Sequence, residues 1–443
     1  MPSLTPIFIP VEISAREFDA KLLMAVHLVE DDTRVFVGET KSIHRLAAGF
    51  KNGLYVGKQA VLGGASPNLK KYHALKKDGH RVLFQAEEEL LLDASKVDMS
   101  QFLMMFDPRW ISTDDYVCAW GEVTAAMFKS AAPDHAPHII ATGHPKFDLC
   151  KSRFSRFFDA EVADIRRRFG DFVLLNTKFA FASNFAALVS AIKDFSDDKP
   201  DNYWLGFFKY HSDLQSAYIC LAARLSRELA GVNIVLRPHP GENPAAYREV
   251  LQAYPNVHVL TEGSVVPWLA AARALVHTGC TTALEAVRLT PTIINYQPVF
   301  DEHYDEPGPR KISIQCRSET EVVDLLKSGT LQDKTSLDCS EINRLIENYP
   351  SEKCASATIA AIAAEVKKQL GSAEARPGVL LMTRLHGLLD KLKSRLRTRK
   401  GMTKYQPSSP VSILQRVAAC GEMLDKPLKT RLHGDRFLEI TLQ

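Results

Sequence analysis

Short apolar runs alternate with helical patterns along the first third of the chain. The runs are residues 7–13, 34–38, 81–84, 116–122 and 139–141, and helical periodicity follows several of them. Strands that alternate with crossover helices are typical of a parallel sheet. The pattern therefore predicts an α/β domain over residues 1–150.

The same alternation resumes after a basic helical stretch at 151–168. The apolar runs here are residues 172–179, 232–236, 257–260, 274–277 and 291–295. Residues 183–230 are mostly helical in pattern, with a polar interruption at 197–202, and a helix at 356–370 closes the unit. This pattern predicts a second Rossmann-like domain over 151–370. The character changes from 376 onwards, and we expect a basic helical tail over 371–443.

Composition and charge exclude several classes of protein. The 443 residues are 46% hydrophobic and 24% charged, as in ordinary globular proteins, and the net charge of +3 is too small to indicate a nucleic-acid partner. The eight cysteines form no C-x-x-C pair, which suits a reducing compartment. The N-terminus lacks signal-peptide features, and no apolar run approaches the length of a membrane span. We expect a cytoplasmic protein.

The tail carries a separate signal. Residues 391–400 contain six cations, and residues 379–389 before them are rich in apolar side chains. A basic amphipathic segment suits an anionic membrane surface, so residues 376–404 are a candidate for peripheral contact with the inner face of the cytoplasmic membrane. A solvated helix and a nucleic-acid arm are the alternatives. The pentapeptide Thr-Arg-Leu-His-Gly occurs twice, at 383–387 and 430–434.

The run at 232–236 ends abruptly at Arg237-Pro-His239-Pro-Gly. Neither proline can donate to a strand ladder, so the strand stops there and places Arg237 and His239 at a carboxyl edge of the sheet. Ligands bind at that edge in open α/β sheets, and an arginine with an imidazole suits a phosphate. Glu242 and Asn243 follow in the same turn. The alternative is a turn with a solvated arginine and a capping histidine.

A second phosphate-suited turn follows the run at 274–277. Its glycine and threonines precede an apolar-periodic helix, whose first amides form an anion site, and Glu285 lies where it can accept from ribose hydroxyls. Asn176 closes the strand of the run at 172–179. The residues predicted here to hold a nucleotide are Asn176, Thr278, Gly279, Thr281, Thr282 and Glu285. The alternative is a threonine-capped helix.

Carboxylates at three strand ends are candidates for catalysis. Glu87 and Glu88 belong to a run of acids after residues 81–84, and crowding by like charges raises a carboxylate's pKa. Asp19 lies in the first turn of a helix that Ser14 and Glu17 open with a capping box. Asp148 follows the run at 139–141. The alternatives are a solvated helix start, a capped helix and a helix N-cap, respectively.

Taken together, these motifs resemble those of bacterial surface-carbohydrate biosynthesis proteins. The resemblance covers residues 7–370 and rests on the segments at 9–19, 143–148, 175–179, 237–243 and 277–279. It implies a glycosyltransferase of the GT-B fold, in which two Rossmann-like domains face each other across a cleft. The His-Pro turn is similar to that of CMP-sugar-using transferases, and the retaining β-Kdo transferases of capsule, lipopolysaccharide and O-antigen assembly look most similar. Glu89 and His144 depart from the family pattern, which has glycine and asparagine there.

The resemblance implies a mechanism. Arg237 and His239 would stabilise the leaving nucleotide without a metal, because the chain shows no convincing Asp-x-Asp pair, and no cofactor beyond the sugar nucleotide is expected. Asp148, with Asp19 as a substitute, is the candidate nucleophile or charge stabiliser, and Glu88 the general acid/base. The partners are a CMP-linked donor and a glycan or glycolipid acceptor. A UDP-sugar or CDP-glycerol donor is one alternative, and a non-catalytic membrane-associated scaffold is another.

Overall fold

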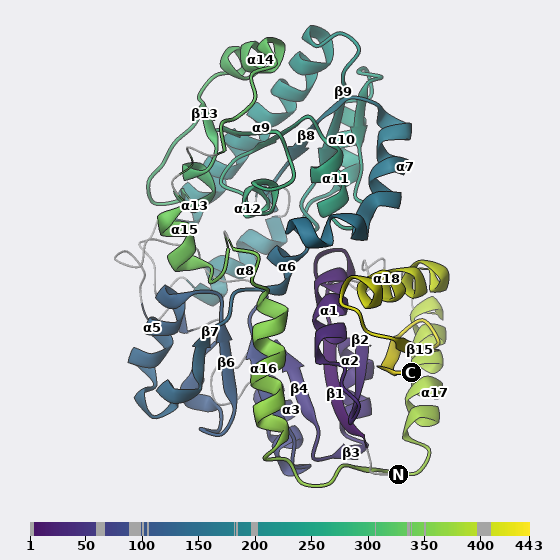
Figure 1. Ribbon diagram of the computed structural model, residues 1–443. Helices are drawn as coiled ribbons and strands as arrows, with labels where there is room; N and C mark the ends of the chain where they lie inside the picture. The colour runs from purple at the N-terminus through teal and green to yellow at the C-terminus, as the bar shows by residue number, and fades with distance from the viewer. Residues whose placement is uncertain are drawn as a thin grey trace. The chain divides into compact units, whose positions relative to one another are not determined.

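The chain forms two compact units, both of the α/β class (Figure 1). The computed structural model describes residues 4–58, 67–87, 99, 102–103, 106–180, 182, 185–195, 203–305, 307–334, 337, 339–349, 351–396 and 409–443. Each unit is built on one main sheet with a parallel core and crossover helices. The predicted fold class, with two Rossmann-like units, is confirmed.

The boundaries of the units differ from the predicted ones. Unit 1 comprises Met1–Phe157 together with Ser340–Gln443, and unit 2 is Phe158–Cys339. The helix predicted to close the second domain belongs to unit 1, where it packs on the first helix of the chain. The first unit is therefore discontinuous in sequence. Local periodicity identified the helix but carries no information on which sheet it covers.

The main sheet of unit 1 has the strand order β15-β16-β2-β1-β4-β5-β6-β7. Its strands are β1 (Thr5–Val11), β2 (Thr33–Glu39), β4 (Leu54–Gly57), β5 (Arg81–Gln85), β6 (Tyr116–Ala119), β7 (Ile139–Ala141), β15 (Leu428–His433) and β16 (Phe437–Leu442). The strands from β2 to β7 pair in parallel. The direction in which strands are added reverses between β1 and β4.

Helices cover both faces of this sheet. They include α1 (Ser14–Leu28), α2 (Thr40–Ala47), α3 (Pro67–Lys77), α5 (Glu122–Ala131), α6 (Pro145–Asp148), α15 (Ser340–Leu345), α16 (Ala355–Lys367), α17 (Val379–Leu396) and α18 (Pro410–Met423). A short antiparallel ladder joins β3 (Phe50–Lys51) to β14 (Glu374–Ala375) and so attaches the C-terminal part of unit 1 to its N-terminal part. Phe8, Phe36 and Phe437 belong to one aromatic core on this sheet, so residues from both ends of the chain stabilise it.

The predicted helical tail is wrong in its last part. Residues 428–442 form a hairpin, and β16 pairs antiparallel with β2. Phe437, Leu438 and Ile440 of β16 are buried, because they cover an edge that β2 would otherwise expose. Lys426, just before the hairpin, donates to the carbonyl oxygens of Val26, His27 and Val29 at 2.7–3.0 Å and so caps the end of α1.

Unit 2 has a six-stranded parallel sheet in the order β10-β9-β8-β11-β12-β13. Its strands are β8 (Phe172–Asn176), β9 (Asn233–Arg237), β10 (Val257–Val259), β11 (Ala274–His277), β12 (Thr292–Tyr296) and β13 (Ile314–Cys316). Numbered within the unit, this is the 3-2-1-4-5-6 order of a doubly wound Rossmann sheet. The direction of winding reverses between β8 and β11.

The helices of unit 2 follow the predicted alternation. They are α7 (Asp159–Phe169), α8 (Phe185–Phe195), α9 (Tyr203–Glu228), α10 (Pro244–Val250), α11 (Val266–Ala271), α12 (Thr282–Ala286), α13 (Pro307–Lys311) and α14 (Glu319–Ser328). The polar interruption at 197–202 lies between α8 and α9, outside the described residues. Leu214, Tyr218 and Leu225 of α9 pack into the core of the sheet. Within the described residues of both units, no helix is long and apolar enough to span a membrane.

Candidate functional site

Each unit has a point where its strand order reverses, and ligands of open α/β sheets bind at the carboxyl edge beside such a point. In unit 1 the edge is formed by the residues that follow β1, β4 and β5. In unit 2 it is formed by the residues that follow β8 and β11. Some of the residues predicted as functional lie at these edges, since Glu87 follows β5, Asn176 ends β8 and Thr278 follows β11.

A buried lysine organises the edge of unit 1. Lys21 of α1 is 3% exposed, and its ammonium donates to the carbonyl oxygen of Pro10 at 2.6 Å and to Glu17 at 2.9 Å. Its third partner is Glu87, whose Oε1 lies 2.8 Å away. Glu17 also accepts the backbone N–H groups of Glu12 and Ile13, which fixes the end of β1 to the start of α1. Ser14, predicted as the N-cap, is the first residue of the helix, and Ile13 occupies the cap position.

The charges of this cluster shift one another's pKa. Burial alone would raise the pKa of Glu87, but the Lys21 ammonium and His144 lower it well below its usual range. Burial opposes the charge on Lys21, and Glu87 and Glu17 outweigh it and raise the pKa of Lys21. Glu87 is therefore an ionised carboxylate at neutral pH. The sequence predicted that crowding by like charges raises the pKa of Glu87. That prediction is wrong, because the Lys21 ammonium lowers this pKa.

Aromatic and basic side chains that follow β6 and β7 lie next to the cluster of Lys21, Glu17 and Glu87. His144, which follows β7, places Nε2 at 3.4 Å from Oε2 of Glu87, and its Nδ1 accepts the N–H of Lys146 at 3.1 Å. Burial lowers the pKa of His144, and Glu87 opposes this shift. The Trp120 indole N–H donates to Ala86 at 2.9 Å, and the Lys146 ammonium lies 4.1 Å from the centroid of the Trp120 ring. Lys21 and Trp120 are members of this site that the sequence reading missed.

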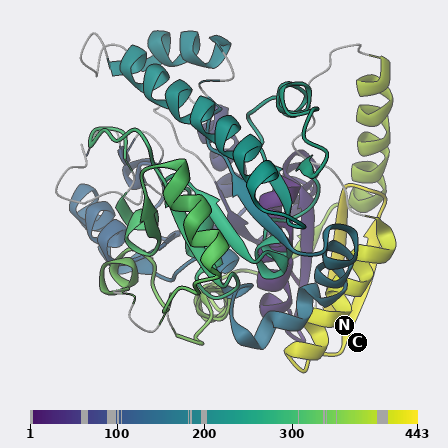
Figure 2. The same cartoon turned by 90° about the horizontal axis from the view of Figure 1, so that it is seen from above.

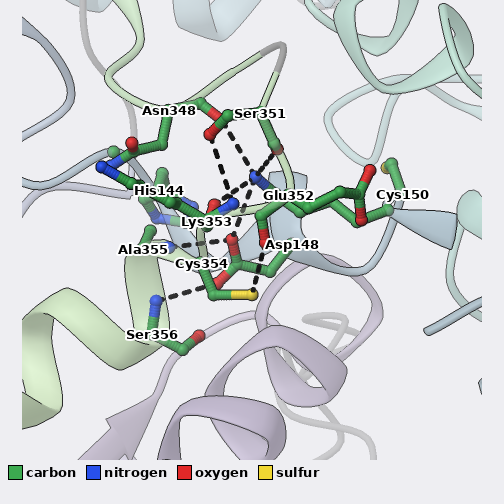
Figure 3. A network of polar contacts seen from close by, with 12 residues as sticks. His144, Asp148, Cys150, Asn348, Ser351, Glu352, Lys353, Cys354, Ala355 and Ser356 are labelled. Carbon is green, nitrogen blue, oxygen red and sulfur yellow. Dashed lines mark hydrogen bonds and ion pairs between the residues drawn. The ribbon is translucent and has the colours of Figure 1, made fainter. Parts of the chain in front are cut away.

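Asp148 has a structural position that excludes its predicted role as nucleophile. Its Oδ1 accepts the N–H of Ala355 at 2.9 Å and its Oδ2 that of Ser356 at 2.8 Å (Figure 3). It is 1% exposed; burial raises its pKa, and the two amides oppose that rise. Both oxygens are occupied by the first turn of α16, so Asp148 caps this helix. The predicted alternative was also a cap, but on a different helix.

The ammonium of Lys151 completes the attachment of α16. It donates to the carbonyl oxygens of Asn348 at 2.9 Å and Ser351 at 2.7 Å, and also to that of Lys353. Figure 3 shows Asn348, Ser351 and Lys353 gathered close to Asp148. Asp148 and Lys151 together hold the returning segment 348–356 on unit 1.

The other two predicted catalytic carboxylates differ in outcome. Asp19 is 6% exposed and is paired with Arg416 of α18, so it fixes the C-terminal segment to α1. That ion pair accounts for Asp19 without a catalytic role. Glu88 lies outside the described residues, and its role as general acid/base stays a prediction.

In unit 2, the Arg-Pro-His-Pro turn follows β9 as predicted, but Arg237 is engaged internally. Its guanidinium donates to the carbonyl oxygens of Glu262 at 2.7 Å and Gly263 at 3.0 Å, and it lies over the Trp268 ring at 5.0 Å. Burial lowers the pKa of Arg237 to about 10. These contacts hold the segment after β10, and the role of Arg237 as a phosphate ligand stays a prediction.

Glu242 and Asn243 also organise the turn. Glu242 is 5% exposed; it accepts the Thr177 hydroxyl at 2.8 Å, the Tyr247 hydroxyl at 2.5 Å and the N–H of Phe179 at 2.7 Å. Burial raises the pKa of Glu242, and these donors oppose the rise. Asn243 caps α10 by accepting the N–H of Ala245 at 3.1 Å. Glu242 connects protein segments, which corrects its prediction as a nucleotide ligand. Asn243 is exposed, and its predicted role as a ligand stays a prediction.

The ring of His239 is oriented by its own turn. Its Nδ1 accepts the N–H of Gly241 at 3.1 Å, and its backbone N–H donates to the Thr177 hydroxyl at 3.2 Å. The imidazole is half-buried. It thus stays at the carboxyl edge where the sequence placed it, and its phosphate role stays a prediction.

The turn after β11 is only partly the predicted anion site. Gly279 has the positive φ of +56° that its role in a close approach requires, but its N–H donates to Asn295 at 3.0 Å. The next N–H, of Cys280, is directed to His277 at 3.3 Å. The helix that follows, α12, has five residues, too few for a substantial dipole. Thr278 is buried, whereas Thr281, Thr282 and Glu285 are half-buried at this edge.

Two groups meet at the reversal point itself. Lys178, two residues beyond β8, donates to the carbonyl oxygen of Gly279 at 3.3 Å, so a cation bridges the turns after β8 and β11. Asn176, the last residue of β8, is 5% exposed, and its Oδ1 is buried without a hydrogen-bond partner among the described residues. Lys178 was missed from the sequence because its importance depends on β8 lying beside β11.

No described group of three or more His, Cys, Asp or Glu side chains is placed to hold a metal ion. The eight cysteines, all within the described residues, form no disulfide.

No protein-family model and no curated protein matches the sequence. Solved structures are similar in fold. UDP-GlcNAc 2-epimerase from Methanocaldococcus jannaschii shares 10% identity at a TM-score of 0.47, over 82% of this chain and 99% of that one. The wall teichoic acid polymerase TagF shares 12% at 0.43, over 83% and 90%. S. aureus MnaA, solved with UDP, shares 12% at 0.43, over 81% and 95%. With TM-scores below 0.5, these likenesses assign neither activity nor ligand to this chain.

Proposed function

We propose that the protein is a metal-independent glycosyltransferase of the GT-B type, which moves a sugar from a nucleotide donor onto a surface glycan. Unit 2 binds the donor at the reversal point between β8 and β11. Unit 1 supplies the acceptor site at the edge that carries Lys21 and Glu87. The acceptor is a glycan or glycolipid at an anionic membrane surface.

One observation carries the donor site. The buried Oδ1 of Asn176 has no described partner, although buried polar atoms almost always form hydrogen bonds. A ribose or sugar hydroxyl is a suitable donor to this atom, and Lys178, two residues further along and bonded to the turn after β11, suits a phosphate. Thr281, Thr282, Glu285 and His239 border the same edge and remain proposed ligands.

The catalytic carboxylate belongs to the loop after β5. Glu88 keeps its proposed role as general acid/base for the acceptor hydroxyl. Glu87 is held ionised by Lys21, so it acts on the reaction through its negative charge and not as a proton donor. An ionised carboxylate near the anomeric carbon stabilises the positive charge that develops in glycosyl transfer.

The donor we propose is CMP-Kdo, as the resemblance implies. The test is isothermal titration of the full chain with CMP, UMP, UDP and CDP-glycerol. CMP should bind and UMP and UDP should not; tighter binding of UDP or CDP-glycerol would replace CMP-Kdo with the corresponding donor. If no nucleotide binds, the protein is a scaffold, which the internal engagement of Arg237 and Glu242 would then explain.

The location of the donor site is tested by Lys178→Gln. Loss of a charge-assisted contact to phosphate should weaken nucleotide binding by about tenfold or more. Lys209→Gln is the matched control in the same unit, because Lys209 is exposed on α9 and paired with Asp213. Equal affinity of wild type and Lys178→Gln would place the nucleotide elsewhere.

Catalysis is tested by turnover with CMP-Kdo and a synthetic glycan acceptor. Glu88→Gln should lower kcat by about a hundredfold or more, as expected for loss of a general acid/base, while nucleotide affinity stays unchanged. A Glu88→Gln variant with wild-type turnover would contradict the assignment.

A further inference from the structure

Beyond its first two residues, helix α17 directs most of its apolar side chains away from the rest of unit 1. Leu381, Met382, Leu385, Leu388 and Leu389 are 44–59% exposed in the described structure. At about 100° per residue these five positions fall within one arc of about 120°. We call this set of five residues the outer stripe.

The opposite side of α17 makes the contacts with the rest of unit 1. Val379 and Leu380 pack against its core at the start of the helix, and the contacting positions further along are small or polar. Thr383 and Gly387 are buried, and Asp390 is paired with Lys41 at 2.9 Å and Arg45 at 2.6 Å of α2. An ordinary surface helix buries its apolar face and exposes its polar one. α17 is reversed, so its attachment to unit 1 does not account for its leucines. In Figure 2 this yellow-green helix lies at the right-hand edge of the view.

The charges near the outer stripe have one sign. Arg384 is exposed on α17, and residues 391–400 add six Lys or Arg residues. Asp390 is the one acidic residue between 379 and 400, and two cations of α2 already neutralise it. An apolar face bordered by cations suits the headgroup region of an anionic bilayer.

A second copy of the chain is a poorer occupant of this face. Pairing two identical stripes would bring two cationic segments together without acidic residues to compensate them. A bilayer with anionic headgroups supplies both the apolar depth and the opposite charge.

We propose that α17 is a membrane-docking helix, which lies in the interface of an anionic bilayer with its outer stripe inserted. This inference specifies the element behind the membrane contact proposed above. It is independent of the donor, so its failure would leave the transferase assignment intact. The docking would hold the chain beside a lipid-linked acceptor.

The test is cosedimentation of the full chain with vesicles of phosphatidylcholine, alone or mixed with phosphatidylglycerol. Wild type should sediment with the mixed vesicles and release at high salt. Leu385→Glu/Leu388→Glu should lower partitioning by at least about tenfold, because each inserted leucine contributes apolar area. Leu331→Glu is the matched control, since Leu331 is 71% exposed in unit 2 and outside the stripe. Thermal melts should show all three proteins folded.

Three results would overturn the proposal. The first is unchanged sedimentation of the double leucine variant, and the second is equal binding to vesicles without phosphatidylglycerol. The third is a wild-type dimer in lipid-free light scattering that becomes monomeric in the double variant, which would assign the stripe to self-association.

Discussion

At the scale of single residues, the structure separates side chains by what their polar atoms already contact. Five residues that were predicted as functional each have a contact within the protein. They are Arg237, Glu242, Asn243, Asp148 and Asp19. The sequence placed Arg237 correctly at the end of a strand, whereas Asp19 and Asp148 lie in helices. It could not show that backbone groups distant in sequence occupy them, because those contacts depend on the tertiary fold.

The ion pair of Lys21 with Glu87 should contribute strongly to stability. Glu87→Gln leaves the buried ammonium with one carboxylate, and we expect a loss of about 3 kcal/mol in the free energy of unfolding at neutral pH. Glu374→Gln breaks an exposed pair with Lys51 and should cost less than about 0.5 kcal/mol. Urea unfolding measures both. Similar small losses for the two variants would show that the buried pair is not important for folding.

The same pair should make unit 1 sensitive to acid. The folded-state pKa of Glu87 lies below its unfolded value, so its contribution is complete above pH 4.5 and is lost as the pH falls towards the lower, folded value. Wild type should therefore lose more stability than Glu87→Gln between pH 5 and the acid limit of folding, measured by thermal melts. Parallel pH profiles would contradict this.

Asp148 should behave as a cap. Asp148→Asn keeps one acceptor for α16 and should cost about 1 kcal/mol, whereas Asp148→Ala leaves two buried N–H groups and should cost about 3 kcal/mol. Turnover of the folded Asn variant should stay near wild type once the assay is established. Loss of turnover without loss of stability would restore the predicted nucleophile.

Two histidines of unit 2 predict a second pH effect. Burial lowers the pKa of His277 and of His211 to about 3 in the folded chain. Below pH 6.5 the unfolded chain takes up a proton at each site and the folded chain does not, so stability falls as the pH falls. At pH 5 each should cost about 2 kcal/mol relative to pH 7. His277→Gln should remove one such contribution. Identical pH slopes for His277→Gln and wild type would disprove the assignment.

At the scale of elements, one pentapeptide shows where local sequence stops being informative. Thr-Arg-Leu-His-Gly is helical in α17 at 383–387 and forms the end of β15 and a turn at 430–434. The second copy pairs with β16, which in turn pairs with β2, about four hundred residues earlier in the chain. By contrast, strongly patterned elements such as β8, β9 and α9 were predicted well, because their apolar spacing matches the faces that they bury.

The two glycines of this repeat should respond oppositely to alanine. Gly434 has a φ of +72°, so Gly434→Ala should cost about 1–2 kcal/mol. Gly387 lies inside α17, where alanine is favoured by about 1 kcal/mol, and the added methyl would meet only the flexible stem of Arg436 at 3.3 Å. Thermal melts should rank Gly387→Ala at or above wild type and Gly434→Ala below it. The reverse order would contradict the assigned conformations.

At the scale of the whole molecule, the sequence predicted two Rossmann-like units but not their discontinuity. The predicted boundary at 370 assigns α16 to the second domain, whereas its buried face packs on α1 of unit 1. Periodicity identifies a helix and its apolar face equally well on either sheet. Two contacts place the C-terminal segments on unit 1: Asp148 caps α16, and β16 pairs with β2. Both join residues more than two hundred positions apart.

The discontinuity predicts how fragments behave. Residues 158–339 contain the whole second sheet and its core, so this fragment should be soluble and unfold cooperatively. Residues 151–370 add α16, whose Ile359, Ala363 and Val366 would lose their cover on α1, so this longer fragment should aggregate. Size-exclusion chromatography and circular dichroism compare the two. A soluble, more stable 151–370 fragment would show that α16 belongs to the second unit, because its apolar face would then have found cover within that fragment alone.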